Sequence, residues 1–448
     1  MASQKAACAN CPPRTEVDLP PDSAHAPCSE PALSSFDTSN FEWLGFDMDH
    51  TFAQYNLEAV NALIFDGLRE HVAKNHVYPE EALEGMKFDV DFVTKGSVFD
   101  VHRGNFVNLT KEGKVCCCKH GSKHVLTADE IVEAYGPSAA FPHFEKMRNF
   151  ERDASAYLPF DSAFSIPSAS ILAKLVDLAD KKAQEELGAS RADSYERELH
   201  ALFGAFEHQY NPAALQERRG MFFPALCDHP EKYLVKTPAN VFEFLEQARA
   251  RGQKTMLVTN SRDDFAHVVM SYVAGPDWDK HFDLVVTSAT KPAFFTGSTP
   301  FNSIKLQSGR EAYEFGNWTA LRDDHGIGTK SNSVLYFGDD LRGDVAALKA
   351  TGGVWAGVAI VEELGDNQHA NEYHVFHCPH APRDALETQW MNAIEENAII
   401  CIPSVEALSS SQKDGILHNC KTTQKQGQTL WFPVTPIDLL QKGNEGCL

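Results

Sequence analysis

The stretch that decides the fold is Trp43-Leu44-Gly45-Phe46-Asp47-Met48-Asp49-His50-Thr51-Phe52-Ala53. It is an apolar run that ends abruptly in two acids one residue apart, with a hydroxyl close behind. This pattern is typical of a buried strand that delivers two carboxylates to the edge of a sheet. Such a pair suits phosphoryl transfer, because one acid can attack phosphorus while the other handles the proton of the leaving group. The prediction depends on matching residues further along the chain.

Three later strands also end in residues suited to this chemistry. Strand and helix patterns alternate from residue 237 onward, which predicts an α/β fold with a doubly wound parallel sheet. Polar residues that directly follow the strands of such a sheet share one crevice. Four strand ends carry them, namely Asp47 with Asp49, Thr259, Lys291, and Asp339 with Asp344. We therefore expect these residues to meet at one site.

The two acids of the first strand and one later acid are predicted to carry the reaction. Transfer of a phosphoryl group from a monoester needs a nucleophile, a proton donor, a charge sink and a metal. We expect Asp47 to be the nucleophile that forms an aspartyl-phosphate, and Asp49 to be the general acid and base. Mg²⁺ prefers oxygen ligands, which Asp47, Asp339 and the backbone carbonyl of Asp49 would supply.

The remaining strand-end residues are predicted to hold the phosphate and support the site. Lys291 would neutralise the crowded negative charge, and Thr259 would offer its hydroxyl and backbone amides to the phosphate oxygens. Asp344 would brace Lys291 or the metal-bound waters. Each residue alone has an ordinary explanation as a turn residue, a solvated lysine or a helix N-terminal acid. Their arrival in order, each after an apolar strand, favours the site.

The spacing of the core strands predicts an inserted domain. About 200 residues separate the first strand from the second, which is far too long for a crossover connection. We expect a core from 39–56 and 236–409 and a large inserted α+β cap domain over 57–235. Its apolar patterns predict helices over 56–74, 168–180 and 195–210 and a β-meander between residues 98 and 118.

The ends of the chain carry weaker signals. Residues 1–38 are rich in Pro, Ser, Ala and Cys, which predicts a disordered arm. Cys8, Cys11 and Cys28 within it suggest zinc ligands, but no fourth ligand has a suitable spacing, so we favour a disordered arm without zinc. Residues 410–448 form a tail in which 430–433 either docks to a partner or packs back on the core.

Composition excludes some classes of partner. The chain carries 40 Lys and Arg against 62 Asp and Glu, a formal net charge of −22. Because a chain with this much negative charge repels polyanions, we expect no nucleic acid polymer and no acidic membrane as partner. No run approaches the roughly 18 apolar residues of a membrane-spanning helix, and the N-terminus lacks the apolar core of a secretory signal.

The eleven cysteines are an odd number. In a large chain without a signal peptide we interpret them as reduced thiols of a cytoplasmic protein. Cys116, Cys117 and Cys118, with His120 and His124 nearby, invite a metal interpretation. Adjacent residues on a strand point to opposite faces, so three consecutive thiolates do not easily converge on one ion, and we favour a packed strand.

The four motifs together resemble those of the haloacid dehalogenase superfamily. The stretches 45–51, 259–261, 291–295 and 338–344, with Lys95-Gly96-Ser97-Val98-Phe99-Asp100, 104–109 and His120-Gly121, are most similar to its cytosolic purine 5′-nucleotidase branch. Within that branch the chain most resembles the type 1 5′-nucleotidase domain-containing proteins, over about residues 41–409. The resemblance implies an α/β core with a cap inserted after the first motif, dependence on Mg²⁺, and hydrolysis of nucleoside 5′-monophosphates.

The resemblance also implies residues that bind the substrate. Asn260 and Ser261 would hold phosphate together with Thr259 and Lys291. The stretch that matches the nucleoside-binding segment is Phe164-Ser165-Ile166-Pro167, in which Phe164 would stack on a base. Ser165 replaces an amide, which leaves the purine preference open. His208 and Tyr210 match further residues of the cap that face the substrate.

Three functions remain open from the sequence. The leading hypothesis is a Mg²⁺-dependent phosphomonoesterase that acts on a small nucleotide-like substrate through an aspartyl-phosphate. The second is a phosphatase for another small phosphorylated metabolite. The third is a binding or scaffold protein that keeps the fold without turnover. The sequence leaves the oligomeric state open, with a homo-oligomer as one possibility.

Overall fold

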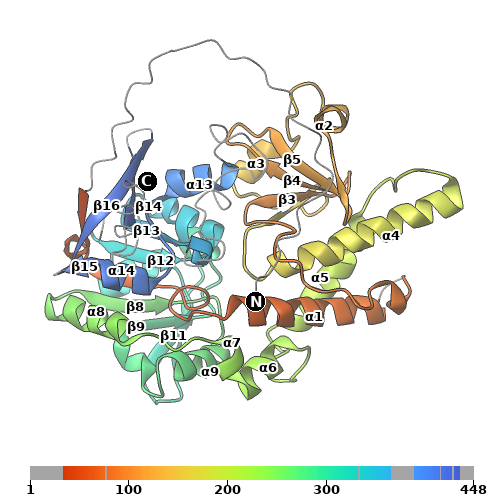
Figure 1. Ribbon diagram of the computed structural model, residues 1–448. Helices are drawn as coiled ribbons and strands as arrows, with labels where there is room; N and C mark the ends of the chain where they lie inside the picture. Colours follow the sequence, from red (N-terminus) through yellow and green to blue (C-terminus); the bar gives the residue numbers. More distant parts are fainter. Residues whose placement is uncertain are drawn as a thin grey trace, which may run out of the picture. The chain divides into compact units, whose positions relative to one another are not determined.

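The predicted first strand lies inside a 12-stranded sheet. The structure is a computed structural model that describes residues 34–75, 78–330, 333–364, 388–413, 415–425 and 428–433. Strand β2 (Trp43–Phe46) runs parallel between β12 (Val334–Gly338) and β8 (Lys254–Val258). Parallel pairing continues from β8 to β9 (Leu284–Thr287), and from β12 through β13 (Trp355–Ile360) to β14 (Ala398–Ile402). The predicted parallel sheet is confirmed (Figure 1).

Helices cover both faces of this sheet, because neighbouring strand residues point to opposite sides. Leu257 packs in one apolar cluster with α8 (Ala239–Ala250) and α9 (Asp263–Val273). The next residue, Val258, belongs to a second cluster with α10 (Ala293–Thr296) and α11 (Trp318–His325). Gly45 is needed between the layers, since a Cβ at this position would lie 2.7 Å from the ring of Tyr336.

The sheet extends beyond the predicted core at both edges. Strand β11 (Glu311–Phe315) runs parallel to β9 and forms a hairpin with β10 (Phe301–Lys305). At the other edge, β17 (Gln428–Pro433) pairs with β14, β16 (Ile416–Lys425) pairs with β17, and β15 (Gln412–Lys413) and β1 (Ser34–Asp37) pair with β16.

The predicted limits of the core, 39–56 and 236–409, are therefore too narrow. The last residues of the predicted arm form β1, and a part of the predicted tail forms β15, β16 and β17. Trp431 contacts Phe36 with ring centroids 5.6 Å apart, so this part of the tail packs back on the core. The polar composition of β16 hides its strand character, because no apolar alternation marks it in the sequence.

The segment after β12 is helical but does not form a regular α-helix. The chain forms a π-helical turn (Leu341–Val345) and then a 3₁₀ helix (Ala346–Thr351). The turn lies tight against the strand end, since a Cβ at Gly338 would lie 2.2 Å from the Cβ of Asp344. Helices α13 (Gln389–Asn397) and α14 (Val405–Ser411) precede and follow β14.

Residues 57–235, called here the inserted segment, lie between β2 and β8 in the sequence, although these two strands are neighbours in the main sheet. They form a second, five-stranded sheet from β3 (Ser97–Asp100), β4 (Asn105–Leu109), β5 (Val115–His120), β6 (His124–Val125) and β7 (Tyr157–Phe160). Its helices are α1 (Leu57–Asn75), α2 (Ala128–Tyr135), α3 (Phe144–Arg148), α4 (Ala169–Leu187), α5 (Glu196–Tyr210), α6 (Phe222–Asp228) and α7 (Pro230–Tyr233). The predicted meander and helices are confirmed (Figure 1).

The cysteines of the described residues are mostly free thiols. Cys117, Cys118, Cys227 and Cys401 are free, and the first two are buried in β5, as the packed-strand prediction requires. Cys116 is disulfide-bonded, so the expectation of reduced thiols is wrong there. Its side chain lies on the opposite face of β5 from Cys117. The cysteines at 8, 11 and 28 lie outside the described residues.

No helix among the described residues has both the length and the apolar character needed to cross a membrane.

Candidate active site

The carboxyl ends of the parallel strands bring the predicted residues together. Asp47 directly follows β2, Thr259 follows β8, and Asp339 follows β12, while Lys291 lies in the loop after β9. The loops that carry them are tight, and His50 in the first loop adopts a left-handed backbone with φ 53°. A side chain at such φ values costs about 1–2 kcal/mol, so the surrounding contacts hold these loops in place.

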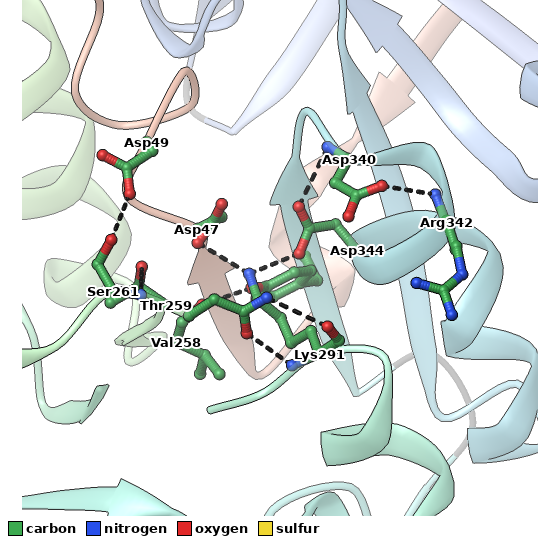
Figure 2. Close-up of polar contacts among 11 residues, drawn as sticks. Asp47, Asp49, Val258, Thr259, Ser261, Lys291, Asp340, Arg342 and Asp344 are labelled. Atoms are coloured by element: carbon green, nitrogen blue, oxygen red, sulfur yellow. Dashed lines mark hydrogen bonds and ion pairs between the residues drawn. The ribbon is translucent and has the colours of Figure 1, made fainter. Parts of the chain in front are cut away.

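Lys291 is the cation at the centre of the site. Its Nζ lies 2.8 Å from Oδ1 of Asp47 and 2.5 Å from Oδ1 of Asp344, and it donates to the hydroxyl of Tyr336 at 2.9 Å. Figure 2 shows Lys291 between the two carboxylates. Burial alone would lower the pKa of Lys291, but the charges of Asp344 and Asp47 outweigh it and hold the pKa well above its ordinary value. Lys291 therefore stays charged.

Three carboxylates form the cluster best suited to a cation within the described part of the chain. One oxygen each of Asp47, Asp339 and Asp344 lies within 4.8 Å of the others. Burial raises the pKa of Asp339 to about 7, with the charges of Asp47 and Asp340 adding to it against His50 and Lys95. Crowded carboxylate oxygens of this kind are the donor set that Mg²⁺ takes in proteins. The residues present thus fit the predicted metal.

Asp49 is fixed through both oxygens of its carboxyl group. Ser261 donates from Oγ to Oδ2 at 2.6 Å, and Tyr55 donates from its hydroxyl to Oδ1 at 2.6 Å. Burial, followed by the charge of Asp47, raises the pKa of Asp49, while the two hydrogen bonds oppose the rise. An acid with a raised pKa holds its proton closer to neutral pH, which suits proton donation.

The strand-end loop after β8 contacts both the cavity and Lys291. Thr259 is buried, and its Oγ1 accepts a hydrogen bond from the backbone N–H of Ser261 at 3.1 Å. Asn260 binds the main chain of Lys291 through both ends of its amide, at 2.6 Å and 3.1 Å. Asn260 therefore positions the loop that carries Lys291, a contact that the sequence analysis did not predict.

A second group of buried charges lies beside Asp339. Nδ1 of His50 lies 2.7 Å from Glu362, and Nζ of Lys95, from the inserted segment, lies 3.1 Å from Glu363. Burial lowers the pKa of both cations, but the neighbouring carboxylates, first Glu362 for His50 and Glu363 for Lys95, outweigh it and raise both. Sequence reasoning missed these pairs, because nothing local links residues more than 250 positions apart.

A cavity of about 470 Å³ opens from the carboxylates toward the inserted segment. Thr259, Asn260 and Ser261 line it together with Asp47, Asp49 and Asp339 at one end. Its other wall is largely aromatic and apolar, with two serines and the charged pair of Arg262 and Asp264 among its residues. That wall consists of Ser162, Phe164, Ser165, Phe206, Tyr210, Pro212, Leu215, Phe222, Phe223, Arg262, Asp264 and Phe265.

Three of the four residues predicted from the inserted segment line this cavity. Phe164, Ser165 and Tyr210 do so, and the rings of Phe164 and Tyr210 lie 5.8 Å apart. His208 is not among the lining residues; its ring packs on that of His71 at 4.4 Å. On a helix, residues two apart point to different faces, whereas residues four apart share one. Phe206, which the sequence analysis missed, lines the cavity for this reason, since it lies one turn before Tyr210.

Comparisons with known proteins give the sequences and structures to which this chain is similar. A model of the 5′ nucleotidase family matches residues 32–424. The 5′-nucleotidase domain-containing protein 1 of Homo sapiens is 30% identical over 335 residues, which cover 72% of this chain and 71% of the human protein. The 5′-nucleotidase domain-containing protein 2 of Rattus norvegicus is 28% identical over 367 residues, which cover 77% and 62%.

Among solved structures, a predicted phosphoglycolate phosphatase from Haemophilus somnus aligns with a TM-score of 0.28 and 17% identity. The alignment covers 72% of this chain and 85% of that one.

Proposed function

Because this chain belongs to the 5′ nucleotidase family, we propose that it is a phosphoric monoester hydrolase that releases phosphate from nucleoside 5′-monophosphates through an aspartyl-phosphate. The observation that carries the proposal is the ion pair of Lys291 with Asp47 beside Asp339 and Asp49 at one end of the cavity. A nucleophile, a proton donor and a charge sink are thereby within reach of one phosphorus atom.

The first half of the reaction is assigned to Asp47 and Asp49. Lys291 holds Oδ1 of Asp47, and we assign the attack on phosphorus to Oδ2. As the new P–O bond forms, the bond to the leaving alcohol breaks, and its electron pair takes the proton of Asp49. In the second half, Asp49 takes a proton from water as that water attacks phosphorus, and the bond to Asp47 breaks.

The cofactor of this reaction is proposed to be Mg²⁺. Asp47 and Asp339 would hold it, together with the predicted backbone carbonyl of Asp49, while Asp344 keeps its contacts with Lys291 and the N–H of Asp340. When bound, Mg²⁺ supplies positive charge to the phosphate oxygens. Thr259 supplies its hydroxyl, and Lys291 a fixed charge, to the same group, whereas the hydroxyl of Ser261 donates to Asp49.

The inserted segment is proposed to be a cap that selects the leaving group. It contributes Phe164, Phe206 and Tyr210 to the cavity, and flat aromatic rings favour a flat base at this end. Ser165 stands where an amide was expected and binds the carbonyl of Ser162 at 2.8 Å. The wall therefore favours stacking over recognition of one base edge, which also keeps other aromatic phosphomonoesters as candidate substrates.

Phosphate release from a panel of phosphomonoesters tests the proposal. Wild-type protein and Asp47→Asn are compared with and without Mg²⁺, on nucleoside monophosphates, sugar phosphates and aryl phosphates. We expect Mg²⁺-dependent release from nucleotides and none above background from the variant. Turnover that survives Asp47→Asn would refute the nucleophile. Activity on sugar phosphates alone would refute the nucleotidase assignment, and binding of nucleotide without release would favour a scaffold.

A further inference from the structure

Tyr55 makes a contact with the catalytic machinery that the reaction scheme does not yet use. Its side chain is buried, with 4% of the residue exposed, and its hydroxyl lies 2.6 Å from Oδ1 of Asp49. The phenolic hydroxyl carries the proton of this contact and donates the hydrogen bond to the carboxylate.

The two oxygens of Asp49 face different surroundings. Oδ2 accepts from Ser261, which lines the cavity, and Figure 2 shows this contact. Oδ1 accepts from Tyr55, which is not among the described residues that line the cavity. The hydrogen bond from Tyr55 thus turns one oxygen away from the cavity and leaves the other on the cavity side.

Tyr55 is itself held at the passage between the core and the inserted segment. The backbone N–H of Asn56 donates to the carbonyl of Tyr233, and the N–H of Val235 donates to the carbonyl of Gln54, both at 2.9 Å. The outgoing and returning chains are therefore joined on both sides of this residue. Its ring also stacks on His50, with centroids 4.4 Å apart and planes 22° apart. The hydroxyl has little freedom to move.

We propose that Tyr55 is a positioning residue that fixes the carboxyl group of Asp49 so that Oδ2 delivers the proton to the leaving oxygen. This inference rests on the proposed function. As Asp47 forms its bond to phosphorus, the bond from phosphorus to the leaving oxygen breaks. The electron pair of that bond stays on the oxygen and takes the proton from Oδ2. Tyr55 keeps its own proton throughout and touches neither substrate nor phosphorus.

The role predicts an effect that depends on the leaving group. Benzyl phosphate releases an alcohol that needs the proton, whereas p-nitrophenyl phosphate releases an anion stable enough to leave without it. Both are small aromatic esters suited to the aromatic wall of the cavity. A positioned general acid contributes about 10²–10⁴-fold, so Tyr55→Phe should lower kcat/KM for benzyl phosphate by at least about tenfold. It should change kcat/KM for p-nitrophenyl phosphate less than about threefold. We compare kcat/KM because it reports the step in which the leaving group departs, whereas hydrolysis of the aspartyl-phosphate is common to both esters.

The chain offers a matched control for the loss of a buried hydroxyl. Tyr195 is also fully buried, and it donates to Oδ1 of Asp180 at the same distance, 2.6 Å, within the inserted segment. We expect Tyr195→Phe to leave the ratio of the two kcat/KM values unchanged. Because both values are measured on one preparation, incomplete folding lowers them by the same factor and leaves the ratio intact.

The outcomes separate the two proposals. The positioning role is supported if kcat/KM for benzyl phosphate, divided by kcat/KM for p-nitrophenyl phosphate, falls in Tyr55→Phe and not in Tyr195→Phe. Equal losses on both substrates, or no loss on either, would overturn that role while wild-type turnover still upholds the hydrolase. If the wild-type protein with Mg²⁺ hydrolyses neither ester nor any member of the panel, both proposals fall.

Discussion

Replacement of Lys291 by methionine isolates the energetic role of the central cation. The side chain is 2% exposed and pairs with Asp47 at 2.8 Å and Asp344 at 2.5 Å. Methionine keeps the apolar stem and removes the charge, which leaves two carboxylates without their partner. Loss of one member of a buried ion pair costs about 3–5 kcal/mol. We expect Lys291→Met to lower the free energy of unfolding by that amount near pH 8.

The cost should shrink as the pH falls. Burial raises the pKa of Asp344 well above its ordinary value, and Lys291→Met removes the charge that opposes this rise. A carboxyl with a raised folded-state pKa binds a proton in the folded protein that the unfolded chain releases at ordinary pH values. Its contribution to stability is therefore present at low pH and is lost as the pH rises. We expect the variant to be closest to the wild type near pH 5.

Urea unfolding followed by tryptophan fluorescence at both pH values measures these costs. The double variant Lys291→Met with Asp344→Asn should recover about 1–3 kcal/mol, since it removes one of the stranded charges. Lys330→Met is the matched control, because Lys330 pairs with Glu42 at 3.1 Å while largely exposed, and such pairs contribute about 0–1 kcal/mol. If Lys291→Met costs no more than the control, or the same at both pH values, the reasoning is refuted.

Three further predictions follow from the site. Burial raises the pKa of Asp339 to about 7 from 3.8, so the metal-free protein should lose stability as the pH rises between these values. Mg²⁺ should therefore raise the melting temperature more at about pH 8 than at pH 5.5. Equal increases at the two pH values would contradict this prediction. Gly338→Ala should lower the free energy of unfolding, measured in urea, by about 1–3 kcal/mol, because its Cβ would lie 2.2 Å from that of Asp344. The control is Gly204→Ala in α5, whose Cβ would meet nothing within 4 Å and which should not lower the free energy of unfolding. Phe206→Ala should raise KM for an aromatic phosphomonoester about tenfold with kcat nearly unchanged, since it lines the cavity wall away from the carboxylates; an unchanged KM would remove it from the site.

The strand-end residues could be predicted because their signals are local. An apolar run followed by Asp47, or by Thr259, marks a buried strand and its carboxyl end within ten residues of sequence. Parallel topology then forces such ends to one edge of the sheet. The order of the motifs predicted that Asp344 braces either Lys291 or the metal-bound waters, and the structure pairs it with Lys291. The sequence did not predict the π-helical turn that carries Asp344.

The residues that the sequence analysis missed depend on contacts without a local signal. His50 and Glu362 are 312 positions apart, and only the folded chain brings them within 2.7 Å. The role of Tyr55 depends on which oxygen of Asp49 it contacts, which no pattern records. His208 was matched to the substrate by position in a motif, but the helical repeat turns it away from the face that carries Tyr210.

The charges of the site predict that phosphate binding itself, and not only turnover, depends on a divalent cation. Lys291 already serves two carboxylates, and the other buried cations near Asp339, His50 and Lys95, are each paired with a glutamate. A dianion that enters such a site in an acidic chain gains little from them, whereas a cation held by Asp47 and Asp339 reverses the local field. Calorimetric titration with inorganic phosphate, at constant ionic strength, should show at least about tenfold weaker binding without Mg²⁺, equivalent to about 1.4 kcal/mol. Equal affinities in the two titrations would mean that the hydroxyls, backbone amides and Lys291 bind phosphate unaided.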